Sequence, residues 1–68
     1  MTAETYLYVQ TVANRMKCRD KTVYRLIQEG KIRAVRIGGR ALRIPESAFN
    51  DYLKGQVVDP GEDILHPR

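Results

Sequence analysis

Apolar residues near the start of the chain recur at intervals of three and four. The first such set is Val9, Val12, Ala13 and Met16. This spacing is typical of an amphipathic helix with one buried stripe, so we predict a helix over residues 9–16. The next three residues, Lys17, Cys18 and Arg19, interrupt the pattern and predict a short turn.

A second helix is predicted over residues 20–29. Its apolar stripe consists of Val23, Leu26 and Ile27. Asp20 stands where a carboxylate can accept hydrogen bonds from the first free amides of a helix, so we expect it to be the N-cap. Gly30 follows the helix and stands where a left-handed residue often ends one.

The period changes to two after residue 34. In Val35-Arg36-Ile37 and Leu42-Arg43-Ile44, branched apolar residues flank a central arginine, which is typical of half-buried strands. Residues 38–41 read Gly-Gly-Arg-Ala and predict a turn, because glycine adopts positive φ easily. We therefore predict a β-hairpin with Arg36 and Arg43 on its open face and Arg40 at its tip.

A third helix is predicted over residues 46–54. Pro45 can start this helix because its missing N–H is not needed in the first turn, and Gly55 is expected to end it. The apolar stripe is Phe49, Tyr52 and Leu53. The elements then follow in the order α-α-β-β-α, which predicts a small α+β fold with three helices and a two-stranded hairpin.

The length of 68 residues allows one small domain, which we assign to residues 1–54. Residues 55–68 contain Pro60, Gly61 and Pro67 without a sustained period, and we expect a flexible acidic tail there. Because no apolar run approaches the length of a membrane span and the N-terminus lacks the features of a signal peptide, we expect a soluble, cytoplasmic, nucleoid-associated protein that binds no membrane.

Catalysis is poorly supported by the residues present. The chain has one cysteine, Cys18, and one histidine, His66, and no metal-ligand spacing or phosphate-binding glycine loop. Cys18 lies in the predicted turn between helices and is interpreted as a small apolar plug rather than a nucleophile. We therefore expect no enzyme activity, cofactor, metal or small-molecule ligand.

Positive charge is concentrated in one part of the chain. Residues 9–45 hold ten basic and two acidic side chains, a net charge of +8, whereas residues 46–68 carry −3. Such a distribution is typical of a surface that meets a polyanion. The alternative is that these charges only keep the domain in solution.

The second predicted helix offers a candidate DNA-contacting face. With the apolar stripe buried, a step of about 100° per residue places Lys21, Arg25 and Gln28 on the opposite side. An α-helix fits the major groove, where such side chains can contact base edges. The candidate contacts of this helix are Arg19, Lys21, Thr22, Tyr24, Arg25 and Gln28. A solvated helix face is the alternative, and Tyr24 could instead cover the core.

The predicted hairpin offers a second candidate contact. Residues 31–44 hold five basic side chains and no acidic one, and arginine is attracted to the negative potential of a narrow minor groove. The candidate contacts of the hairpin are Arg33, Arg36, Gly39, Arg40 and Arg43. Beside the second helix, they would form one continuous basic face.

Three segments of the chain resemble the excisionase-type helix-turn-helix family. They are T-V-Y-R-L-I-x-x-G-x-I over residues 22–32, V-R-I-G over residues 35–38 and R-I-P over residues 43–45. This family is a winged-helix relative of the DNA-binding domain of mercury-resistance regulators. The resemblance, over about residues 6–54, implies a DNA-binding module with the second helix in the major groove and the hairpin as the wing.

Two positions depart from the family pattern. Tyr8 stands where the family often has a Thr or Ser cap, and Arg19 stands where a small hydroxyl residue is common. Arg19 could instead contact a phosphate near the start of the second helix. The family includes members with different tasks, so the resemblance alone does not choose among them.

Three functions are therefore considered. The leading hypothesis is an architectural protein resembling excisionases, which bends double-stranded DNA, binds a site-specific recombinase or neighbouring copies, and biases that recombinase toward excision. It is favoured because only about 14 residues follow the predicted winged helix, too few for the dimerisation helix and ligand domain of a mercury-type regulator. The alternatives are a small transcriptional regulator with the same DNA-binding face, and a protein-interaction module whose basic face binds an acidic partner.

Overall fold

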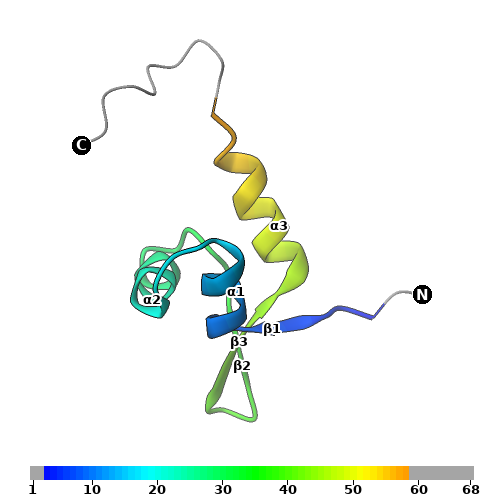
Figure 1. The fold of residues 1–68 in the computed structure, drawn as a ribbon. Helices are drawn as coiled ribbons and strands as arrows, with labels where there is room; N and C mark the ends of the chain where they lie inside the picture. Colours follow the sequence, from blue (N-terminus) through cyan, green and yellow to red (C-terminus); the bar gives the residue numbers. More distant parts are fainter. Residues whose placement is uncertain (1–2, 59–68) are drawn as a thin grey trace.

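The computed structural model describes residues 3–58 and contains three helices and three strands (Figure 1). In chain order the elements are β1 (Tyr6–Tyr8), α1 (Val9–Arg15), α2 (Asp20–Gln28), β2 (Val35–Ile37), β3 (Ala41–Pro45) and α3 (Glu46–Gly55). The α+β class and the predicted helix, helix, hairpin, helix order are confirmed. Residues 59–68, with His66 and most of the predicted acidic tail, lie outside the described residues.

One strand was not predicted. β1 pairs with β3 in an antiparallel sheet of order β1-β3-β2, with Leu7 opposite Ile44. The pairing continues before the strand, where the amide of Glu46 donates to the carbonyl of Thr5 at 2.8 Å. Three residues are too few to display a period of two, and the partner of β1 lies more than thirty residues further along the chain. The element order is therefore β-α-α-β-β-α.

The register of the hairpin also differs from the prediction. β2 and β3 pair Val35 with Arg43, Arg36 with Leu42 and Ile37 with Ala41, so the loop has three residues instead of four. Side chains of paired residues share a face, and neighbouring residues alternate between faces. Arg36 and Arg43 consequently lie on opposite faces of the hairpin, and the expectation that they share its open face was wrong. Ile37, expected to be half-buried, is 48% exposed.

The core lies where the sheet meets the three helices. Its buried apolar residues are Leu7, Val9, Val12, Ala13, Val23, Leu26, Ile32, Ile44, Ala48 and Phe49. Seven of these ten come from β1, α1, α2 and β3, the elements that surround the candidate DNA-contacting side chains. Leu53 was expected in the buried stripe of α3 but is 40% exposed. Cys18 packs against the core, as expected for a small apolar plug.

The helix ends differ slightly from the prediction. Arg19, in an extended conformation, is the N-cap of α2, and Asp20 is its first helical residue without a side-chain capping hydrogen bond. The expected capping role of Asp20 was therefore wrong, although an acidic side chain in the first turn still favours the helix dipole. Gly30 has φ +76°, which confirms its predicted role after α2. Pro45 ends β3 and is the N-cap of α3.

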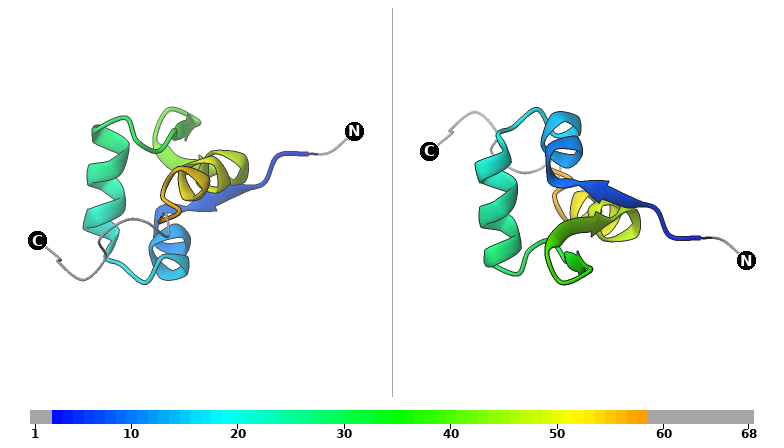
Figure 2. Two further views of the ribbon diagram at one scale, coloured as in Figure 1. Left: turned by 90° about the horizontal axis from the view of Figure 1, so that it is seen from above. Right: turned by 90° about the horizontal axis from the view of Figure 1, so that it is seen from below.

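The arrangement separates two ends of the molecule. The β2–β3 hairpin and α3 extend in opposite directions from the centre, and α2 lies to one side of the sheet (Figures 1 and 2). The outward face of α2 and the hairpin are therefore left uncovered by α3. Across residues 3–58, no helix combines the length and apolar content needed to cross a membrane.

Candidate nucleic-acid interface

The outward face of α2 forms a shallow depression of about 430 Å³. The residues that line it are Arg19, Lys21, Thr22, Tyr24, Arg25 and Gln28. These are the six candidate contacts predicted for this helix, and the structure places all of them around one depression. The helical period predicted this outward face because Val23 and Leu26 are buried on the opposite side of α2.

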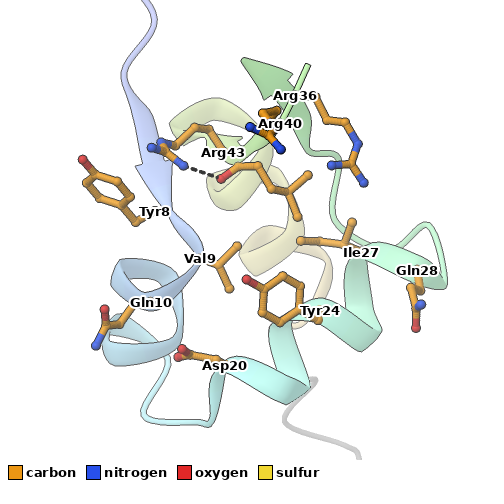
Figure 3. A pocket seen from close by; sticks show the side chains of 11 residues that line it. Tyr8, Val9, Gln10, Asp20, Tyr24, Ile27, Gln28, Arg36, Arg40 and Arg43 are labelled. Atoms are coloured by element: carbon orange, nitrogen blue, oxygen red, sulfur yellow. Dashed lines mark hydrogen bonds between the residues drawn. The ribbon is translucent and has the colours of Figure 1, made fainter. Parts of the chain in front are cut away.

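A larger depression of about 750 Å³ lies between α2, the hairpin and the junction of β1 with α1 (Figure 3). Arg36, Arg40 and Arg43 line its hairpin side. Tyr24 and Gln28 line its α2 side and also line the shallow depression on α2. The two depressions therefore meet along Tyr24 and Gln28, and form one surface that we call the helix–hairpin surface.

Two of the predicted hairpin contacts, Arg33 and Gly39, do not line either depression. Arg33 lines a separate hollow of about 250 Å³ with Asp51 and Tyr52 of α3, so the structure does not bring it to the helix–hairpin surface. Gly39 lies in the loop at the hairpin tip with φ +78°. A residue with a side chain is strained in this conformation, so glycine is needed there for the turn itself.

The basic residues of the helix–hairpin surface have no acidic partner among residues 3–58. The salt bridges within these residues join Arg15 to Glu46 at 3.4 Å and Lys31 to Glu29 at 3.5 Å. Neither includes any of the predicted contacts Arg19, Lys21, Arg25, Arg36, Arg40 and Arg43. Within residues 3–58, the positive charges of this surface are therefore not neutralised by a salt bridge.

The structure adds three polar residues that the sequence analysis did not select. Tyr8, Gln10 and Asp20 line the larger depression at the side of β1, α1 and α2 (Figure 3). Tyr8 and Gln10 come close to the hairpin only because β1 pairs with β3. Without that strand, nothing in the sequence relates residue 8 to residue 43. Within the described part of the chain, no group of three His, Cys, Asp or Glu residues could hold a metal.

A model of the helix-turn-helix domain family matches residues 6–57. The chain belongs to this family. In the structure, α1 and α2 are the two helices of the helix-turn-helix, and α2, the second of them, carries the shallow basic depression.

Two relatives from one species are similar to this helix-turn-helix domain. Both bear the name "Putative DNA-binding protein" and come from the CDC 1551 and H37Rv strains of Mycobacterium tuberculosis. Each is 40% identical over 55 residues, which cover 81% of this chain and 69% of the relative. No solved structure matches the chain significantly.

Proposed function

We propose that this helix-turn-helix domain binds double-stranded DNA in a sequence-specific manner, with α2 in the major groove and the β2–β3 hairpin in the adjacent minor groove. The observation that carries the proposal is the helix–hairpin surface, in which five α2 residues, their N-cap Arg19 and three hairpin arginines adjoin. Within residues 3–58 none of the basic side chains of this surface forms a salt bridge with an acidic residue. The names of the two mycobacterial relatives support the same conclusion.

The side chains of α2 suit the major groove. Lys21 and Arg25 can donate to the O6 and N7 atoms of guanine, and Gln28 can form paired hydrogen bonds with adenine. Thr22 and Arg19, near the start of the helix, are suited to phosphate oxygens or to a base edge. Lys21 and Arg25 are four residues apart and repel each other on a free helix, so a phosphate or base acceptor between them relieves that repulsion.

The hairpin suits a narrower groove. Arg40 follows the two glycines at its tip, and a ribbon that ends in a small loop with one arginine can enter a minor groove. Arg36 and Arg43 lie on opposite faces of this ribbon. We therefore propose that they contact the two sugar–phosphate walls that border the groove.

The salt dependence of affinity tests DNA binding. If about five to seven phosphates are neutralised, the logarithm of the association constant should fall with the logarithm of salt concentration with a slope of about −4 to −6. Fluorescence anisotropy with a labelled duplex measures this slope. A flat dependence would contradict the proposal, and retention on an acidic protein but not on duplex DNA would favour the protein-interaction alternative.

The finer role that we propose is architectural. The motifs at residues 22–32, 35–38 and 43–45 resemble excisionases, and contacts in adjacent grooves favour a bent duplex whose deformation costs about 1–6 kcal/mol. In this role the domain bends DNA in an attachment region and biases a site-specific recombinase toward excision, in contact with that recombinase or with neighbouring copies.

Footprinting and a gel-based bending assay on DNA that flanks the gene of this protein test the architectural role. Protected sites beside a recombinase attachment site, with a bend at their centre, are expected. Footprints confined to promoters, without a bend, would contradict the role and favour a transcriptional regulator.

A further inference from the structure

Tyr8 and Arg43 form a cross-strand pair on the outer face of the sheet. They are direct partners in the β1–β3 register. The guanidinium carbon of Arg43 lies 4.2 Å from the centroid of the Tyr8 ring, within the range of a cation–π interaction (Figure 3). The ring therefore covers one side of the guanidinium group.

The same guanidinium group also forms a hydrogen bond with the backbone. Nη1 of Arg43 donates to the carbonyl oxygen of Leu42 at 2.9 Å. Arginine carries five N–H donors in a planar fork, so this bond leaves donors for another acceptor. Within residues 3–58 Arg43 has no carboxylate partner. Two contacts thus orient its side chain, while its charge is not neutralised within these residues.

This arrangement distinguishes Arg43 from its neighbours. Arg25, Arg36 and Arg40 are exposed, whereas Arg43 is half-buried. Long exposed side chains lose rotamer freedom when they bind, and that loss weakens binding. Arg43 should lose less of this freedom on binding, because in the free protein the Tyr8 ring and the Leu42 carbonyl already contact its guanidinium group.

We propose that Tyr8 is a positioning residue that holds Arg43 ready to bind a DNA phosphate. The inference rests on the proposed DNA binding and extends it, since it assigns a role to β1. A phosphate fits better than a base, because the planar guanidinium fork matches phosphate oxygens and a contact fixed before binding cannot adapt to different bases. Arg43 then anchors the DNA backbone beside the groove that Arg40 enters.

The Tyr8 ring should contribute little to the stability of the fold. Its removal should therefore act mainly through the loss of its contact with Arg43. Tyr8 is 60% exposed, so it buries little apolar surface. Tyr6, two residues earlier, provides a matched control. It is also exposed, projects from the same face of β1, and pairs with Pro45 rather than with an arginine.

The test measures duplex affinity over a range of salt for wild type, Tyr8→Leu, Tyr8→Phe, Arg43→Gln and Tyr6→Leu. Tyr8→Leu should weaken binding about two- to fivefold, as expected for an exposed cation–π contact, equally on specific and random duplex. Its salt slope should stay at the wild-type value because Arg43 keeps its charge. Arg43→Gln should make the slope shallower by about 1. Tyr8→Phe keeps the ring, so it should bind like wild type, as should Tyr6→Leu.

Three results would overturn the inference while DNA binding stands. The first is that Tyr8→Leu binds as well as wild type. The second is that Tyr8→Phe loses as much affinity as Tyr8→Leu. The third is that, in a double variant with Arg43→Gln, Tyr8→Leu costs as much affinity as it does alone. If wild type binds no duplex at all, the proposed function itself fails. Arg43→Lys keeps the charge but loses both the planar stack and the fork, so it should weaken binding at least as much as Tyr8→Leu and leave the salt slope unchanged. It serves as the second variant if thermal unfolding shows that Tyr8→Leu does not fold.

Discussion

The α2 helix and the β2–β3 hairpin both carry arginines toward the helix–hairpin surface, but they obtain their orientation in different ways. In α2 the direction of every side chain follows from the helical period within nine consecutive residues. In the hairpin it depends on the length of a loop and on pairing with other strands. A change of one residue in register moves a whole strand's side chains to the other face.

The side-chain directions in α2 are therefore set by the helix itself, whereas those in the hairpin depend on the rest of the fold. Arg36 and Arg43 are central residues of similar triplets, yet they lie on opposite faces because the loop has three residues. β1 also fixes the sheet from a position that precedes both helices. It follows that changes in β1 should affect hairpin contacts more than α2 contacts.

The largest effect is expected from Leu7→Ala. Leu7 is 6% exposed in β1 and opposite Ile44, so removal of its side chain should lower the free energy of unfolding by about 2–5 kcal/mol. Urea denaturation monitored by circular dichroism measures the change. Tyr6→Ala, on the exposed face of the same strand, is the control and should cost far less. Equal effects would show that β1 does not contribute to the core.

Arg25→Ala should have the next largest effect, and it tests the α2 side of the comparison. If Arg25 contacts a base, affinity for the specific site should fall by about 1–3 kcal/mol, with a smaller loss on random duplex. Competition binding with both duplexes measures the two losses. An equal loss on both would assign Arg25 to a phosphate and leave base contacts to Lys21 or Gln28.

Gly39→Ala tests how the hairpin depends on its loop. At φ +78° an added side chain is strained, so stability should fall by about 1–2 kcal/mol although no atom lies within 4 Å of the new Cβ. Gly55→Ala is the matched control, because Gly55 also has open space but lies in α3 without positive φ. It should be neutral or slightly stabilising. A stable Gly39→Ala variant would contradict the described loop.

Arg15→Gln should have the smallest effect. Arg15 already pairs with Glu46 and lies outside the helix–hairpin surface, and both side chains are well exposed. The pair should contribute less than about 1 kcal/mol to stability. The salt slope of duplex binding should change less than in Arg40→Gln, which removes an unpaired charge. A larger change for Arg15→Gln would place the DNA across α1.

The sequence predicted most of the fold and grouped the residues that line the depression on α2, whereas their contacts with DNA stay a prediction. The three helices, the hairpin and Gly30 were recognised because each depends on residues that are close in the chain. β1 was missed because three residues show no period, and the Tyr8–Arg43 contact was missed with it. Arg33 was grouped with the hairpin by its place in the sequence, but the chain turns it toward α3 before β2 begins.

Joint binding of DNA by α2 and the hairpin is tested most directly by titrating isotope-labelled protein with a duplex and following the amide chemical shifts. If α2 and the hairpin bind DNA as one surface, shifts should change in two groups at the same DNA concentration, one around Lys21 and Arg25 in α2 and one around Arg40 in the hairpin, with small changes in α3. Changes confined to one of the two elements, or largest in α3, would contradict the claim that helix and hairpin bind DNA as one surface.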